Sequence, residues 1–174
     1  MQHHHGDLWV FAYGSLIWRP GFDYVERCPA LLKGAHRKLC VYSHVHRGTR
    51  EQPGLVLGLD HGGACRGVAF RVDAHRQEET IAYLRAREQI NMVYRECVRP
   101  VRLDDGRQVL ALCYVVDRAH SQYAARLERE EVLQLVRQGV GQSGANPDYV
   151  RNTALALKEL GIHDSLLDWI SARV

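Results

Sequence analysis

Two stretches of this sequence have residue types and spacing that could do chemistry, and the first is a turn near the N-terminus. An apolar run over residues 8–13 stops at Gly14 and Ser15 before it resumes at Leu16. Glycine lets another group approach the main chain closely. If the N–H groups of Gly14, Ser15 and Leu16 point the same way, they form a concavity that suits a carboxylate. On these residues alone, a core strand that ends in an ordinary tight turn is the simpler interpretation.

The second stretch is a helical pattern that ends in an acid. Apolar side chains at Ala74, Ile81 and Leu84 share one stripe, and one further turn brings that stripe to Glu88. Glutamate is rarely buried without a partner or a function. Because Arg85 and Arg87 are neighbours, a structural ion pair is the more common explanation for such a residue. The functional alternative is that Glu88 acts as a general acid/base.

Other reaction types have weaker support. His44 and His46 have no third ligand at a metal-binding spacing, so we expect no metal. A Gly-x-Ser-x-Gly elbow is absent around Ser15, and the glycine-rich residues 139–144 follow a helical pattern, unlike a nucleotide-binding loop. The cysteines form no Cys-x-x-Cys pair and lie in strand-like or apolar settings that disfavour a thiolate nucleophile. They are Cys28, Cys40, Cys65, Cys97 and Cys113.

Strand-like patterns dominate the first two thirds of the chain. We expect strands over residues 8–13 and 35–42, then a polar loop over residues 43–53 that carries Arg47 and Arg50. Residues 54–59 and 65–72 flank a His-Gly-Gly-Ala segment, which predicts that they pair as a hairpin. A second hairpin is predicted for residues 97–103 and 108–116, and Pro100 places the first of these strands at an edge or a bulge.

Helical patterns fill the remainder. We predict helices over residues 73–87 with Asp73 as N-cap, 128–138, 146–160 with Asn146 as N-cap, and 164–170. The strands and helices together indicate an α+β fold with one antiparallel-rich sheet.

Length and composition limit the possible functions. The chain has 174 residues, 46% of them hydrophobic, which suits one domain over residues 8–174; residues 1–7, with His3–His5, form a tail that is set aside. The net charge of +3 is scattered, so nucleic acid is not an expected partner. No apolar run could span a membrane and the N-terminus lacks signal-peptide character, so we expect a cytoplasmic protein.

Four groups of residues follow one another along the chain, and their combination is more specific for a protein family than any single group. They are Tyr13-Gly14-Ser15-Leu16-Ile17-Trp18-Arg19-Pro20; His46-Arg47-Gly48-Thr49 with Pro53-Gly54; Tyr83-Leu84 with Arg87-Glu88 and Tyr94; and Gly144-Ala145-Asn146 with Tyr149. Over nearly the whole chain they resemble the ChaC-type, glutathione-specific γ-glutamylcyclotransferases.

The resemblance implies a barrel-like, mostly antiparallel twisted sheet with surrounding helices. It implies that the loop of Tyr13, Gly14, Ser15 and Leu16 grips a γ-glutamyl group, that Glu88 is catalytic, and that Arg47 and Tyr94 belong to the same pocket. The family usually has a glycine between the glutamate and the tyrosine, where this chain has Met92-Val93. Asn146 is also followed by Pro147.

The implied reaction makes modest demands on the protein. The α-amine of a γ-glutamyl peptide such as glutathione closes onto its own γ-amide, releasing 5-oxoproline and an amine (Cys-Gly from glutathione), so no cofactor is required. Burial would raise the pKa of Glu88 toward that of the amine, and we therefore expect Arg87 to point away from it. Two alternatives remain open: a cyclotransferase for other γ-glutamyl amines or amino acids, and a non-catalytic protein that binds a small anion.

Overall fold

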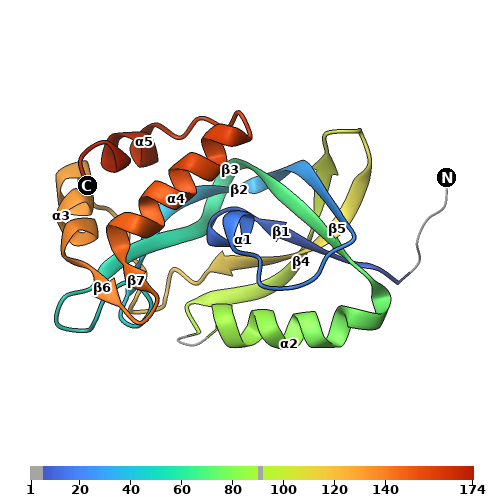
Figure 1. The fold of residues 1–174 in the computed structure, drawn as a ribbon, viewed down its shortest axis with the longest axis horizontal. Coiled ribbons are helices and arrows are strands. Elements are labelled where there is room, and N and C mark those ends of the chain that lie inside the picture. Colours follow the sequence, from blue (N-terminus) through green and yellow to red (C-terminus); the bar gives the residue numbers. More distant parts are fainter. Residues whose placement is uncertain (1–5, 90–91) are drawn as a thin grey trace.

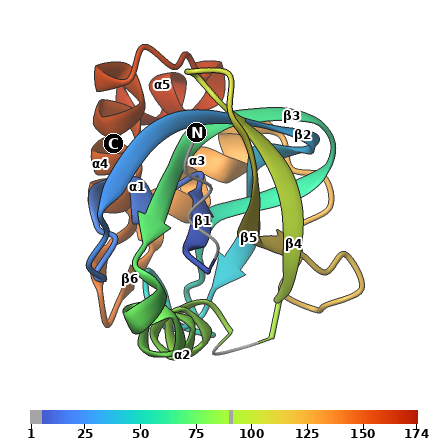
Figure 2. The same cartoon turned by 90° about the vertical axis from the view of Figure 1, so that its right-hand side faces the viewer.

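A closed five-stranded barrel forms the centre of the molecule (Figures 1 and 2). The computed structural model describes residues 6–89 and 92–174; the His3–His5 run lies outside the described residues. The strands follow the order β1-β3-β2-β4-β5, with antiparallel pairing except where β5 lies parallel to β1 and β3. Their bounds are β1 Leu8–Ala12, β2 Glu26–Ser43, β3 Gly54–Val72, β4 Tyr94–Leu103 and β5 Gln108–Val116. The predicted α+β class with a barrel-like sheet is confirmed.

The predicted hairpin around residues 61–64 is wrong. Residues 54–72 are one continuous strand, β3, which pairs along its whole length with β2. Gly62 and Gly63 take φ angles of 97° and 69°, and Gly34 on β2 takes 91°. The register of the pair shifts between Lys33 and Ala35. Positive-φ glycines at a bulge bend a strand, so these glycines curve two long strands into the barrel instead of reversing the chain.

β1 brings the predicted binding turn to one end of the barrel. The strand pairs with β3 on one side and β5 on the other, and residues 9–12 are buried. Gly67 on β3 has no room for a side chain, because a Cβ there would meet the carbonyl oxygen of Ala12. The chain then leaves the sheet into the short helix α1, Ser15–Trp18.

The helix that carries Glu88 lies beside the barrel, on the side away from the C-terminal helices (Figure 1). A 3-10 turn, η1 (Ala74–Arg76), begins where the Asp73 side chain accepts from the N–H of His75, and α2 follows over Gln77–Glu88. Leu84 is buried and Ile81 half-buried, as the apolar stripe predicts, but Ala74 is exposed. The helix is confirmed, with its packing concentrated in its second half.

The remaining helices cover the other side of the barrel (Figure 1). The β4–β5 hairpin is confirmed, and Pro100 lies outside the three-residue stretch of β4 that pairs with β2. The later elements are α3 Arg129–Gln138, β6 Val140–Gly141, β7 Gly144–Ala145, α4 Asn146–Glu159 and α5 Ser165–Ser171. Within the described residues, no helix is long and apolar enough to cross a membrane.

Asn146 is not the N-cap of α4; Ala145 occupies that position. The Asn146 side chain is fully buried and reaches across to β3, where Oδ1 accepts from the N–H of Leu55 (2.7 Å) and Nδ2 donates to its carbonyl (2.9 Å). A side-chain amide can bond both main-chain groups of one residue, and Asn146 forms this pair of hydrogen bonds instead of capping the helix. It fixes α4 against the end of β3.

We expect Asn146→Ala to lower the free energy of unfolding by about 2–4 kcal/mol, because both main-chain groups of buried Leu55 lose their partners. Urea denaturation measures the loss. Asn152→Ala, at an exposed position of α4, is the matched control and should fall within about 0.5 kcal/mol of the parent. Equal stability of the two variants would contradict this role.

Candidate active site

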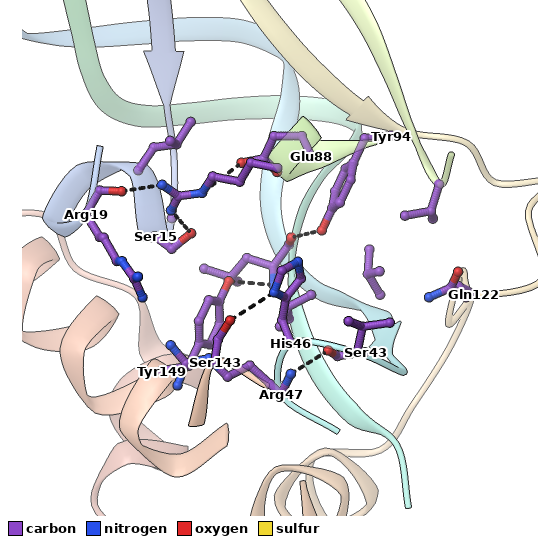
Figure 3. Close-up of a pocket in the computed structure, with 18 of the residues that line it drawn as sticks. Ser15, Arg19, Ser43, His46, Arg47, Glu88, Tyr94, Gln122, Ser143 and Tyr149 are labelled. Atoms are coloured by element: carbon purple, nitrogen blue, oxygen red, sulfur yellow. Dashed lines mark hydrogen bonds and ion pairs between the residues drawn. The ribbon is translucent and has the colours of Figure 1, made fainter. Parts of the chain in front are cut away.

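A cavity of about 400 Å³ opens at the end of the barrel where β1 meets α1 (Figure 3). All seven residues singled out from the sequence line it: Tyr13, Gly14, Ser15, Leu16, Arg47, Glu88 and Tyr94. They come from four separate regions of the chain and meet only because the sheet closes.

The turn after β1 presents free main-chain donors. The N–H of Ile17 bonds the carbonyl of Gly14 (2.9 Å), and the N–H of Arg19 bonds that of Ser15 (2.7 Å), which closes the turn. Over the described chain, the N–H groups of Gly14, Ser15 and Leu16 have no backbone acceptor. A Cβ on Gly14 would lie 3.3 Å from Leu57 Cδ1, so the absence of a side chain keeps this wall of the cavity open. Three unsatisfied donors of this kind suit an anion.

Glu88 lies at the end of α2 with its side chain 14% exposed. Burial raises the pKa of its carboxyl group, and the nearby Arg87 guanidinium lowers it; burial dominates. Arg85, the other candidate for an ion pair, instead bonds Glu96 on β4 (2.9 Å). The carboxylate of Glu88 is thus left facing the cavity with a raised pKa, which favours a role in proton transfer.

The prediction that Arg87 points away from Glu88 is wrong. Its side chain is 18% exposed, and Nε lies 3.7 Å from Glu88 Oε1. Nη2 donates to Ser15 Oγ (3.0 Å), and Nη1 donates to the Arg19 carbonyl (2.5 Å). The first residue of α1 and the residue after its end supply these acceptors, so the guanidinium turns inward to reach them.

Buried tyrosines surround the carboxylate. Tyr94 Oη donates to the carbonyl of Leu57 (2.8 Å), and Tyr149 Oη accepts from the N–H of the same residue (2.9 Å). Burial, with the charge of Glu88 as a further contribution, raises the pKa of Tyr13, Tyr94 and Tyr149. These phenols therefore stay protonated at neutral pH.

Tyr94 reaches the cavity although the chain lacks the glycine that the resemblance leads one to expect before it. Met92 takes a φ of 58°, a left-handed conformation that glycine adopts at little cost. Met92 adopts this left-handed conformation without being glycine, and Tyr94 begins β4 as a buried residue.

Arg47 forms the opposite wall of the cavity. It is 6% exposed, its Nη1 donates to the carbonyl of Ala145 (3.1 Å), and its guanidinium lies 5.6 Å from the ring of Tyr149. Among the described residues it forms no salt bridge. A buried cation without a carboxylate partner is a candidate to bind an anionic ligand.

Three further residues of this wall were given no site role from the sequence, although two of them stand in the quoted motifs: His46, Ser143 and Tyr149. His46 Nδ1 lies 2.9 Å from Ser143 Oγ, whereas its buried Nε2 has no hydrogen-bond partner among the residues that the structure describes. Burial, and then Arg87, Arg47 and Arg19, lower the pKa of His46, which keeps the ring neutral. His46 and Tyr149 were part of quoted motifs, but nothing local to His46 or Ser143 indicated that these two residues, 97 positions apart, would meet. Within residues 6–89 and 92–174, no group of three or more metal-binding side chains is gathered.

Comparison with known proteins places the chain in a family. The model of the family described as ChaC-like protein matches residues 8–174. The chain belongs to the ChaC-like protein family. Among ChaC-like relatives, the Escherichia coli protein named glutathione-specific gamma-glutamylcyclotransferase is 34% identical over 163 residues, which cover 94% of this chain and 71% of that protein.

Two further comparisons agree with the ChaC-like assignment. A Schizosaccharomyces pombe protein of the same name is 32% identical over 174 residues, covering 89% of this chain and 85% of the relative. A crystal structure titled as a gamma-glutamyl cyclotransferase specific to glutathione from yeast superposes with a TM-score of 0.88 and 22% identity, over 97% of this chain and 95% of that one. At that identity the likeness establishes the fold, which confirms the fold family expected from the sequence.

The raised pKa of Glu88 predicts that Glu88→Gln stabilises the ChaC-like protein at neutral pH. A raised carboxyl pKa means that the folded state binds the proton more tightly than the unfolded state does. The parent therefore loses stability as the pH rises from the ordinary glutamate range through the raised pKa, whereas the glutamine variant has no such loss. Urea denaturation at pH 4 and pH 7.5 should show an advantage of the variant that grows with pH; an advantage that shrinks would contradict the assignment.

Proposed function

We propose that this ChaC-like protein is a γ-glutamylcyclotransferase that converts glutathione to 5-oxoproline and Cys-Gly. The names of two relatives support this activity, because these proteins are 32–34% identical to this chain over most of its length. The observation that carries the proposal is one shared cavity for the Glu88 carboxylate and the free N–H groups of Gly14, Ser15 and Leu16.

The substrate supplies its own nucleophile, so the protein has to hold one conformer. The N–H groups of the turn bind the α-carboxylate of the glutamyl group, and the α-amine then lies toward Glu88. Holding an amine against its own γ-carbonyl is worth up to about 7–11 kcal/mol as effective molarity. The C–N bond that forms closes a five-membered ring, and the bond to the cysteine nitrogen breaks.

Glu88 relays the protons that the reaction requires. The substrate ammonium loses one proton before its nitrogen attacks and a second as the lactam forms; Glu88 passes them to the leaving cysteine nitrogen, which departs as an ammonium group, so the protein ends in its starting state. With ordinary pKa values near 4.3 for glutamate and 7.8 for an α-amine, the first transfer is uphill by about 3.5 units, or about 5 kcal/mol. Burial of Glu88 raises its pKa and reduces that difference.

Arg47 suits the far end of glutathione. The tripeptide has a second carboxylate on its glycine, about two residues from the reacting carbonyl, and Arg47 with the neighbouring Arg19 lines the cavity away from Glu88. A volume of about 400 Å³ lies within the range of sites that enclose small ligands. No metal or organic cofactor enters any step.

Incubation of the purified protein with glutathione, followed by mass detection of 5-oxoproline and Cys-Gly, tests the proposal. Glu88→Gln keeps the shape of the side chain and should lower kcat by about 10²–10⁴-fold, the usual contribution of a general acid/base. Glu96→Gln is the matched control, since Glu96 pairs with Arg85 outside the cavity and should leave the rate unchanged.

Three outcomes would redirect the proposal. Turnover of γ-glutamyl amino acids or amines in preference to glutathione would assign the alternative substrate class. Tight binding of glutathione without products would indicate an anion-binding protein. A wild-type rate in Glu88→Gln would remove the role assigned to that carboxylate.

For Arg47→Met we expect kcat/KM for glutathione to fall by about 10–100-fold, mainly through KM, because a charge-assisted bond to the glycine carboxylate is worth about 1.5–3 kcal/mol. A γ-glutamyl amine without a second carboxylate should be affected far less. Arg50→Met, at an exposed position of the same loop, is the control. Equal losses for both substrates would show that Arg47 acts on the fold of the site and not on this carboxylate.

A further inference from the structure

Arg87 joins the two halves of the proposed site. On one side it contacts α1 and the segment after it: Nη2 donates to Ser15 Oγ (3.0 Å), and Nη1 donates to the carbonyls of Arg19 (2.5 Å) and Pro20 (3.2 Å). On its own helix, Nη1 also donates to Tyr83 Oη (3.0 Å), and Nε faces Glu88 Oε1 at 3.7 Å. Figure 3 labels three of the residues that this guanidinium contacts: Ser15, Arg19 and Glu88.

These contacts have a directional requirement that only a guanidinium meets. α1 has four residues: buried Leu16 and Ile17 and the bond from Trp18 Nε1 to Thr153 Oγ1 (3.0 Å) anchor it to the core and to α4, and Arg87 Nη2 is the donor that holds Ser15 at its start. Arginine presents several N–H donors in a rigid planar fork, whereas lysine presents one compact charge. Every acceptor on the α1 side is reached by the two terminal nitrogens of this fork.

We propose that Arg87 is a positioning residue that fixes the carboxylate-binding turn relative to Glu88 and, through its charge, keeps Glu88 available as a base. The proposal rests on the proposed function, since it assigns a role within that same site. Arg87 itself contacts neither reacting atom; it acts through Ser15 and Glu88.

The electrostatic half of the proposal follows from what surrounds Glu88. Burial raises the pKa of Glu88, and Arg87 is the charged group that opposes this rise. The other titratable groups of the described residues that sense the Glu88 charge are phenols from the turn after β1 and from β4, β5 and α4, all with pKa values raised: Tyr13, Tyr94, Tyr114 and Tyr149. Because these phenols are neutral, removal of the Arg87 charge leaves burial unopposed.

His46 on the opposite wall is the second group that Arg87 influences, because the arginine contributes to lowering its pKa. Loss of the Arg87 charge would therefore act on His46 and Glu88 in the same direction. A test has to separate the two groups, and replacing His46 with glutamine does so.

Three substitutions separate the geometric and electrostatic roles. Arg87→Lys keeps the charge and loses the fork; we expect kcat/KM for glutathione to fall by about tenfold or more, with the acid limb of its pH profile unmoved. Arg87→Gln loses both, and its acid limb should also move to higher pH by about 1 unit or more, because a cation within about 4 Å lowers a carboxyl pKa by about 1–3 units. Ser15→Ala removes only the link to the turn and should raise KM more than it lowers kcat.

The experiment measures kcat and KM for glutathione from pH 5 to pH 9 for these variants, and repeats Arg87→Gln in a His46→Gln background. Arg85→Gln is the matched control, because Arg85 lies on the same helix and pairs with Glu96 outside the cavity. A shift of the acid limb that persists without His46 supports the assignment to Glu88. Wild-type kcat/KM and an unmoved acid limb in Arg87→Gln would overturn the proposal.

Two further results keep this test separate from that of the reaction itself. If the parent releases no 5-oxoproline, the proposed function fails before Arg87 is tested. If the parent is active and Glu88→Gln is not, only the Arg87 variants decide this inference. Should Arg87→Gln not fold, as judged by its thermal unfolding, Arg87→Lys decides, and full activity with lysine would overturn the geometric role.

Discussion

The site depends on one ionisable carboxyl group held largely out of water beside a single cation. Burying a carboxylate is costly, and the raised pKa of Glu88 expresses that cost. The Gly14–Leu16 turn, which is proposed to bind the substrate carboxylate, lines the same cavity, and a carboxylate bound there would be repelled by an ionised Glu88. Arg87 contacts Ser15 in the turn and faces Glu88, so in the role proposed for it the guanidinium charge offsets that repulsion.

The closed barrel brings the turn, Glu88 and the tyrosines to one cavity. β1 delivers the turn, α2 delivers Glu88, β4 begins with Tyr94, and α4 contributes Tyr149. Leu57 on β3 is the point where two of these regions meet, because its carbonyl and N–H bond Tyr94 and Tyr149. Asn146 fixes the strand two residues earlier. Each of these bonds joins segments distant in sequence, so the geometry of the site is a property of the closed sheet and not of any local motif.

Much of the fold and of the site could be predicted from the sequence, and the errors share a cause. Period-two and helical patterns predicted the β4–β5 hairpin and the helices, because those signals are local. The resemblance to the ChaC-type family supplied the pocket residues, including Arg47, that spacing alone left ambiguous. Gly62-Gly63, Asn146 and Arg87 were each assigned the common local role of their residue type: a turn, a cap and a solvated charge. Their actual roles depend on partners on β2, on β3 and after α1, which no local pattern records.

The same charge arrangement bears on how the proposed reaction ends. Glutathione brings an ammonium group to Glu88 and two carboxylates to the turn and to the Arg47 wall, so every charge in the cavity has a partner. Ring closure consumes the ammonium, because its nitrogen loses two protons on becoming a neutral amide, and Glu88 relays them to the leaving amine, which departs as the ammonium group of Cys-Gly. Once Cys-Gly has left, 5-oxoproline carries only a carboxylate, in a cavity where Glu88 is again ionised, the substrate ammonium is gone and Arg87 is the cation that remains beside Glu88. Coulomb repulsion in a partly desolvated site is stronger than in water, so the chemistry itself weakens the hold on the product. Glu88 thereby discriminates the open γ-glutamyl substrate from the closed ring by charge, using the same carboxylate that moves the proton.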